Sequence, residues 1–308
     1  ARSTADVALV LRAATATGVP VVPRGAGTGL SGAANALDGC VVLSLMAMDR
    51  ILEVDPVDGV AVVQPGVLNA AVKRAAAEHG LSYPPDPSSF EICSIGGNLA
   101  TNAGGLRCLR GGITRQSTLA LEVVLASGEV FRTGGRTVKR RAGYDLVSLF
   151  VGSEGTLGVI TEATLRLRPA RGATATALAA LATIAGAAVA VRTVAGSRLR
   201  VSALELMDRV TVRAVEAMRP LGLDTAAAAT LLIELEDVGG DDLAVLEGLC
   251  RDAGAAEVST AEDPQEQEWL WAARREALPA LDRLGATLLD DVIVPRGRIE
   301  ELLVATER

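Results

Sequence analysis

The sequence predicts an α+β protein of two domains, residues 1–170 and 171–308, and three observations lead to this prediction. The chain has 308 residues, more than one typical domain contains. Hydrophobic residues make up 49% and charged residues 22%, which is the balance of a globular chain with a buried core. After Arg171 the pattern changes, because short strands separated by glycine-rich loops give way to a regular alternation of strands and helices. The domain boundary is therefore expected near residue 170.

The first domain is expected to combine short strands with two helices. Val7, Leu9, Val10 and Leu11 are expected on one face of a helix that a nearby Ser or Thr can cap. A stretch over residues 83–112, rich in Pro, Gly and other small residues, is expected to be irregular. The expected elements are helices over residues 3–17 and 69–79 and strands over 21–23, 41–45, 51–55, 60–64, 120–126, 130–133 and 163–167.

The second domain is expected to alternate strands with longer helices. Its strands are predicted over residues 174–178, 201–206, 230–236, 255–260 and 287–294, and its helices over 183–195, 208–218, 241–253, 264–284 and 298–306. Residues 172–191 carry no charge and have the length of a membrane span. They are mostly Ala, Thr and Gly, which gain little from transfer to lipid, and Arg171 and Arg192 flank them. A strand followed by an Ala-rich helix is therefore favoured, and no transmembrane segment is expected.

Charge and cysteine content exclude several classes of partner and site. Thirty basic against 37 acidic residues give a net charge of −7, which argues against a nucleic acid as the main partner. Cys40, Cys93, Cys108 and Cys250 show no C-x-x-C spacing, and the one histidine, His79, cannot complete a finger-type zinc site. We therefore predict no metal site in this chain. The scattered thiols and the lack of a basic segment leading into an apolar run predict a cytoplasmic protein without a signal peptide.

A first glycine-rich segment, residues 24–32, follows a predicted strand. Glycine at nearly every second position lets several backbone N–H groups turn toward one point, as in a pyrophosphate cradle. Gly27, Gly29 and Gly32 have the spacing of the Rossmann fingerprint, but residues 33–39 are too short for the helix that a Rossmann unit requires. The alternative for this segment alone is a solvent-exposed loop with flexible glycines.

Two further segments favour an extended ligand. Gly96, Gly97 and Gly104 allow close approach of the backbone, and Thr101 and Asn102 offer side-chain hydrogen bonds. A third glycine-containing run covers residues 152–158. Three such segments suit a dinucleotide with two phosphates and two ring systems better than a simple phosphate. An NAD(P) enzyme of the Rossmann type is one alternative, which a yellow protein without nicotinamide dependence would exclude.

The motifs in these segments resemble one family. In order, they are Pro-Arg-Gly-Ala-Gly-Thr-Gly-Leu-Ser-Gly over residues 23–32, Pro-Pro-Asp-Pro-Ser over 84–88, Ile-Gly-Gly-Asn-Leu-Ala-Thr-Asn-Ala-Gly-Gly over 95–105 and Gly-Ser-Glu-Gly-Thr-Leu-Gly-Val-Ile over 152–160. The chain is similar to FAD-linked oxidases with an FAD domain of the vanillyl-alcohol oxidase and p-cresol methylhydroxylase type. Within that type it is most similar to glycolate oxidase flavin subunits and to D-lactate and D-2-hydroxyglutarate dehydrogenases.

The resemblance implies an FAD domain of two subdomains and a second domain, the cap, that covers the flavin with an antiparallel sheet and helices. Thr28 stands where some relatives carry a histidine that anchors the flavin covalently, so non-covalent FAD is expected. The residues that the resemblance assigns to FAD are Arg24, Gly25, Ala26, Gly27, Thr28, Gly29, Leu30, Pro87, Ser88, Ile95, Gly96, Gly97, Ala100, Thr101, Asn102, Gly104, Glu154, Gly158, Val159 and Ile160.

Arg274 is the residue that the resemblance assigns to the carboxylate of the substrate. A guanidinium pairs naturally with a planar carboxylate. Two alternatives stay open: Arg275 exchanges roles with Arg274, or both arginines lie on the solvated face of a charged helix. The related UDP-sugar reductases use the same FAD domain, but the sequence around Trp271 argues against that activity.

The resemblance implies oxidation of a 2-hydroxy acid such as glycolate or D-lactate, with electrons passing to a quinone, an iron–sulfur subunit or another carrier. The family's histidine motif, which supplies metal ligands and a base, does not occur before Arg308. We therefore expect the second domain to be truncated, a divalent metal to require the part that is missing, and this chain alone to be catalytically incomplete. The alternative is an FAD-binding subunit that acts with a partner. Membrane association through a partner, the specific acid and the homo- or hetero-oligomeric state stay open.

Overall fold

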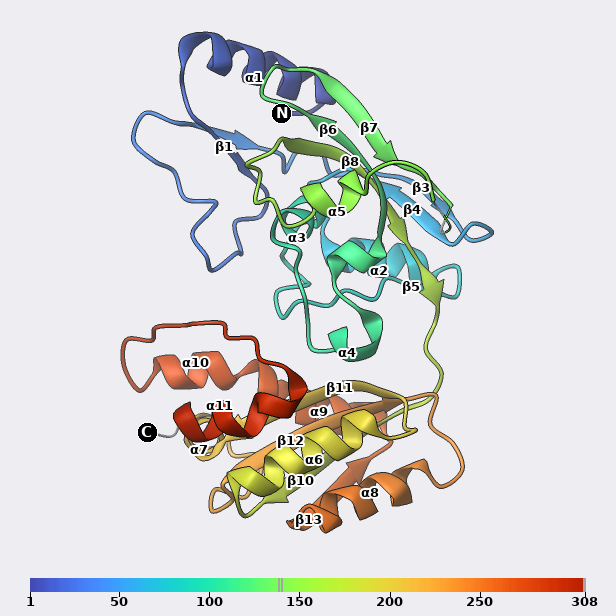
Figure 1. Cartoon of the computed structure of the whole chain (residues 1–308), viewed down its shortest axis with the longest axis vertical. Coiled ribbons are helices and arrows are strands. Elements are labelled where there is room, and N and C mark those ends of the chain that lie inside the picture. The colour runs from blue at the N-terminus through green and yellow to red at the C-terminus, as the bar shows by residue number, and fades with distance from the viewer. Residues whose placement is uncertain (138, 140, 307–308) are drawn as a thin grey trace. The chain divides into compact units, whose positions relative to one another are not determined.

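The computed structural model describes residues 1–137, 139 and 141–306, and its backbone separates into two compact units, Ala1–Ala170 and Arg171–Arg308 (Figure 1). The first unit opens with helix α1 (Thr4–Thr17). Ser3 caps this helix by accepting a hydrogen bond from the Asp6 N–H, and Gly18 ends it at a φ of 69°. Strand β1 (Val21–Arg24) then pairs in parallel with β2 (Val41–Ser44).

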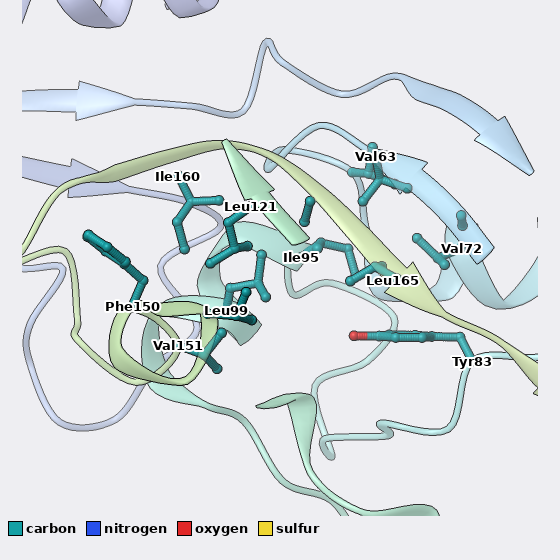
Figure 2. Packing of buried hydrophobic residues seen from close by; sticks show 14 of the residues in the cluster. Val63, Val72, Tyr83, Ile95, Leu99, Leu121, Phe150, Val151, Ile160 and Leu165 are labelled. Carbon is teal, nitrogen blue, oxygen red and sulfur yellow. The ribbon is translucent and has the colours of Figure 1, made fainter. Parts of the chain in front are cut away.

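A five-stranded antiparallel sheet forms the centre of the first unit. Its order is β3 (Ile51–Asp55), β4 (Val60–Val63), β8 (Val159–Arg166), β6 (Thr118–Val124) and β7 (Val130–Gly134). Val63, Leu121 and Leu165 of the sheet pack with Ile95 and Leu99 in one buried cluster (Figure 2). The remaining elements are helices α2 (Asn69–Ala77), α3 (Ile95–Thr101), α4 (Cys108–Gly111) and α5 (Leu146–Phe150), the 3-10 turn η1 (Thr114–Ser117), and the short strands β5 (Leu81–Ser82) and β9 (Arg168–Pro169), which pair with each other.

The second unit is one antiparallel sheet with helices. The sheet order is β11 (Val201–Asp208), β12 (Ala229–Glu236), β10 (Thr174–Leu181) and β13 (Ala255–Ala261). Helices α6 (Ile184–Gly196) and α8 (Asp242–Asp252) share an apolar cluster with alternate residues of β10 and β12. The other elements are α7 (Arg209–Met218), α9 (Pro264–Arg275), α10 (Ala277–Asp282), the 3-10 turn η2 (Arg296–Arg298) and α11 (Ile299–Thr306). These two antiparallel sheets with their helices confirm the predicted α+β class.

The uncharged stretch over residues 172–191 forms β10 and the start of α6, as predicted. Within residues 1–137, 139 and 141–306, no helix has both the length and the apolar character needed to cross a bilayer.

Three secondary-structure predictions were wrong. Residues 95–101 form helix α3 rather than irregular chain, because Ser94 caps the helix and Ile95 and Leu99 are fully buried, which outweighs the low helix propensity of Gly96 and Gly97. The predicted helix over residues 264–284 divides into α9 and α10 at Glu276. The predicted strand over residues 287–294 does not form in the described structure, where two aspartates interrupt it and Leu288 and Ile293 stay exposed.

Candidate functional site

The first unit contains a cavity of about 440 Å³ that three separate segments line. The first segment is the loop that follows β1, from Arg24 to Ala34. The second runs through α3, and the third is the turn that precedes β8, including Ser153 and Glu154. The volume falls within the range of small-molecule sites, roughly 300 to 1,000 Å³. The candidate site is therefore one cavity built from the three glycine-containing segments that the sequence singled out.

The loop after β1 turns back on itself through glycines. Gly27 and Gly32 have φ values of 71° and 84°, a conformation that residues with a Cβ atom rarely adopt. The carbonyl of Arg24 accepts a hydrogen bond from the N–H of Leu45 at 2.9 Å, which fixes the start of the loop to the residue after β2. Residues of this loop line the cavity, and the loop does not continue as a β-strand.

The side chain of Ser94 joins the first and second segments. Its hydroxyl oxygen accepts hydrogen bonds from the N–H of Ala26 at 3.2 Å and from the N–H of Gly97 at 3.3 Å. Ser94 is 1% exposed, so this junction lies below the cavity surface. A Cβ atom at Gly25 would lie 2.3 Å from the Ser94 oxygen, which explains why the loop passes this point with a glycine.

The third segment is attached to α3 through its backbone. The N–H groups of Gly152 and Glu154 donate to the carbonyls of Leu99 and Ala100, both at 2.9 Å. Glu154 adopts a φ of 51°, and a Cβ atom at Gly155 would lie 2.5 Å from Cγ of Pro23 in β1. The three segments are thus linked by direct contacts and hold the cavity open between them.

The cavity lining is small and nearly neutral. Arg24 and Glu154 are the charged residues among those that line it, Asn98 contributes a carboxamide, and the other side chains are small, hydroxyl-bearing or apolar. Backbone amides in glycine-rich segments, together with short hydroxyl side chains, suit a ligand whose phosphates are held mainly by hydrogen bonds from the main chain. These residues therefore fit FAD. Side chains at Gly25, Gly97 and Gly155 would meet Ser94 or Pro23, so glycine at these positions allows the three segments to approach one another.

Most residues assigned to FAD from the sequence lie around this cavity. Those that line it are Arg24, Gly25, Ala26, Gly27, Thr28, Gly29, Leu30, Pro87, Gly96, Gly97, Ala100, Thr101, Glu154, Gly158, Val159 and Ile160.

Four of the assigned residues do not line it. Ser88 is exposed, Ile95 is 0% exposed in the core, and Gly104 packs beside the sulfur of Cys108. Asn102 ends α3 at a φ of 51°, and its Oδ1 accepts a hydrogen bond from the N–H of Arg115 at 3.0 Å. Because α3 is a helix, neighbouring residues point in different directions, and a motif read as a continuous loop overestimates how many of them face one ligand.

Sequence reasoning missed several lining residues, of which Ser94 is the most informative. A serine three residues before Gly97 has the spacing of a helix cap, and this signal could have identified both the helix and its link to the first loop. The other missed residues are Pro23, Ser31, Ala33, Ala34, Leu45, Ser89 and Ser153.

Arg274 lies in the second unit, near the end of α9. Its Nε donates a hydrogen bond to Oε2 of Glu205 in β11 at 2.7 Å. Its neighbour Arg275 instead forms an ion pair with Glu268, which lies on the same helix. The structure thus gives the two candidate arginines different environments.

No group of three or more His, Cys, Asp or Glu side chains in the described part of the chain is arranged to hold a metal ion. His79 is exposed just after α2, and its N–H donates to the carbonyl of Ala76 at 3.0 Å.

Comparison with protein families matches both units. Residues 1–134 match the model described as the FAD binding domain, and residues 171–308 match the C-terminal domain of FAD linked oxidases. A solved structure of alkyldihydroxyacetonephosphate synthase shares the fold, with a TM-score of 0.74 and 22% identity over 92% of this chain and 58% of that chain.

Curated relatives are more similar in sequence. The glycolate oxidase subunit GlcD of Bacillus subtilis is 42% identical over 99% of this chain and 66% of its own length. The GlcD subunit of Escherichia coli K12 is 41% identical over 94% of this chain and 59% of its length. A D-lactate dehydrogenase of Anaerostipes hadrus is 35% identical over 100% of this chain and 67% of its length. The chain therefore spans about three fifths to two thirds of the length of these three relatives. On these matches, the chain belongs to the family of FAD-linked oxidases.

Proposed function

We propose that this chain is the FAD-binding and substrate-binding part of an enzyme that oxidises a 2-hydroxy acid to the 2-oxo acid. The observation that carries the proposal is the convergence of three glycine-containing segments on one cavity. The names of the relatives support the reaction class, since they include a glycolate oxidase subunit and a D-lactate dehydrogenase. Glycolate and D-lactate are accordingly the first substrates to test.

In this proposal the chain's own residues bind FAD and orient the substrate. Backbone amides of the first loop and of α3 hold the pyrophosphate of FAD, and Ser94 keeps these two segments together. FAD held by these residues would supply a hydride acceptor for oxidation of the substrate carbon. Arg274 holds the substrate carboxylate, because its planar guanidinium can form two parallel hydrogen bonds to it.

Anaerobic reduction of the flavin tests this function. The purified protein, loaded with FAD, is mixed with glycolate or D-lactate in the absence of oxygen, and L-lactate serves as a stereochemical control. We expect the visible absorbance of oxidised flavin to disappear with at least one of the two acids. Bound FAD that neither acid reduces would favour the second candidate, an FAD-binding subunit that needs a partner, which the word "subunit" in the relatives' names supports.

FAD is expected to be dissociable. Thr28 lines the cavity, and it stands where the resemblance places the flavin-anchoring histidine of some relatives, so no imidazole nitrogen is present at this position to bond to the flavin. When the yellow protein is precipitated with acid, all flavin should therefore remain in the supernatant, where its absorbance and fluorescence identify it as FAD. Flavin that stays with the washed precipitate would contradict this prediction. The same protein dialysed against concentrated bromide should lose its colour and recover it when FAD is added.

The proposal extends to partners. Electrons leave to a quinone, an iron–sulfur subunit or another carrier, and the chain functions within a larger assembly in the cytoplasm, associating with a membrane only through a partner. The relatives named as glycolate oxidase subunits support an assembly of unlike chains.

A further inference from the structure

We propose that Glu205 is a positioning residue that fixes the orientation of Arg274 for the substrate carboxylate. The inference rests on the proposed function, because it assumes that Arg274 binds the carboxylate. It goes beyond that function by assigning a role to Glu205, an acidic residue that would otherwise be expected to repel an anionic substrate.

The contact that carries the inference joins a helix to a strand. Arg274 Nε donates to Glu205 Oε2 at 2.7 Å, and the two side chains are 33% and 21% exposed. Helix α9 itself is held to the same sheet by Trp271, whose Nε1 donates to the hydroxyl of Thr176 at 3.2 Å, and by Gln267, whose Oε1 accepts from that hydroxyl at the same distance. Residues 267, 271 and 274 follow the spacing of one helix face. The contacts of Trp271 and Gln267 therefore fix the backbone of α9 that carries Arg274, and Glu205 fixes the side chain of Arg274 at its Nε.

The geometry of a guanidinium makes this second point of attachment useful. Its Nε–H points to one side, while the two terminal nitrogens form a fork that matches the two oxygens of a carboxylate. An acceptor at Nε fixes the plane of the group and leaves the fork for another carboxylate. Among the described residues, Glu205 is the hydrogen-bond partner of Arg274, and its bond goes to Nε rather than to the fork.

Arg275 shows the opposite arrangement. One of its terminal nitrogens, rather than Nε, bonds to Glu268, whose side chain is 66% exposed. This bond occupies the fork of Arg275, and an exposed ion pair of this kind contributes little to stability. Carboxylate binding requires both terminal nitrogens of the guanidinium. The bond to Glu205 leaves them available in Arg274, whereas the bond to Glu268 uses one of them in Arg275, and this difference favours Arg274.

The experiment compares two substitutions of Glu205. Glu205→Gln keeps an oxygen that can accept the Nε hydrogen bond, whereas Glu205→Ala removes the acceptor altogether. The FAD-loaded protein is assayed for kcat and KM with the acid that reduces it, and binding of oxalate, an unreactive carboxylate, is measured by calorimetry. Glu268→Ala is the matched control, because it breaks the neighbouring arginine's ion pair on the same helix.

We expect Glu205→Ala to raise both KM and the oxalate Kd by roughly tenfold, with a smaller change in kcat. Glu205→Gln should stay within about threefold of the unsubstituted protein, as should Glu268→Ala. Thermal melting of each variant reports whether the second unit is folded, and oxalate binding is compared only between variants with the same melting curve.

Two outcomes would overturn the inference. If Glu205→Ala binds oxalate as tightly as the unsubstituted protein, Glu205 does not position Arg274. If Glu205→Gln weakens binding as much as Glu205→Ala, the carboxylate acts through its charge and not through the hydrogen bond. Failure of the underlying function looks different, because Arg274→Lys would then leave oxalate binding unchanged.

Discussion

Replacing Gly25 by alanine is expected to weaken FAD binding by about a hundredfold. The added methyl group would lie 2.3 Å from the hydroxyl oxygen of Ser94, well inside van der Waals contact. Ser94 is 1% exposed and accepts hydrogen bonds from Ala26 and Gly97, so its hydroxyl cannot turn away without leaving these two amides unsatisfied. The alternative is an outward shift of the first loop, which would widen the cavity where the pyrophosphate is proposed to bind.

The matched control for this substitution is Gly135→Ala. Gly135 lies in the same unit, no heavy atom of the described residues lies within 4 Å of its Cβ position, and its φ is not in the left-handed region. Titration of flavin-free protein with FAD, followed by the quenching of flavin fluorescence, gives the dissociation constant of each variant. Gly25→Ala that binds FAD as tightly as Gly135→Ala would show that the loop and α3 need not approach each other closely.

Replacing Arg274 by lysine is expected to lower kcat/KM for the 2-hydroxy acid by about a hundredfold. Lysine keeps the positive charge but presents a single ammonium group in place of the planar fork. It also lacks the Nε that donates to Glu205 at 2.7 Å. Lysine therefore can neither form two parallel hydrogen bonds to the carboxylate nor be held in one orientation by that contact. Most of the loss should appear in KM and in the affinity for oxalate.

Arg275→Lys is the control for this prediction. The Arg275 side chain pairs with Glu268 at the surface of α9, and lysine can keep that ion pair. We expect a change of less than about threefold in kcat/KM. A larger effect at Arg275 than at Arg274 would assign the carboxylate to Arg275 and overturn the assignment made here.

Much of the fold was predictable because its signals are local. Alternating or continuous apolar runs marked the strands of both sheets, and turn residues such as Gly18 marked the ends of helices. Helix α3 was not predictable from propensity, since Gly96 and Gly97 disfavour a helix. Gly96 is required there because a Cβ atom would lie 2.7 Å from Pro65. These two residues are far apart in the sequence, so local propensity does not reveal the contact.

The strand predicted over residues 287–294 failed for a related reason. Its Val, Ile and Leu residues have strong strand propensity, but a strand also needs a neighbouring strand to pair with. The four strands of the second unit form their ladders with one another, and the 287–294 segment lies outside that sheet in the described structure. Propensity alone does not contain the pairing partner.

The candidate site was predictable to the extent that it is made of backbone. Glycines in three segments indicated where the main chain can approach a ligand, and these segments surround one cavity. The residues that link the segments were harder to predict from the sequence. Ser94 acts through contacts with Ala26 and Gly97, and the contact between Glu205 and Arg274 joins residues 69 positions apart. Such pairs depend on tertiary structure rather than on a sequence motif.

The most direct test of this account is a titration of the flavin-free protein with FAD. If the three segments form a dinucleotide site, flavin fluorescence should be quenched until one FAD is bound per chain, and Gly25→Ala should require far more FAD to reach the same point. A folded protein, with a cooperative melting transition, that leaves the fluorescence of added FAD unchanged would contradict the account.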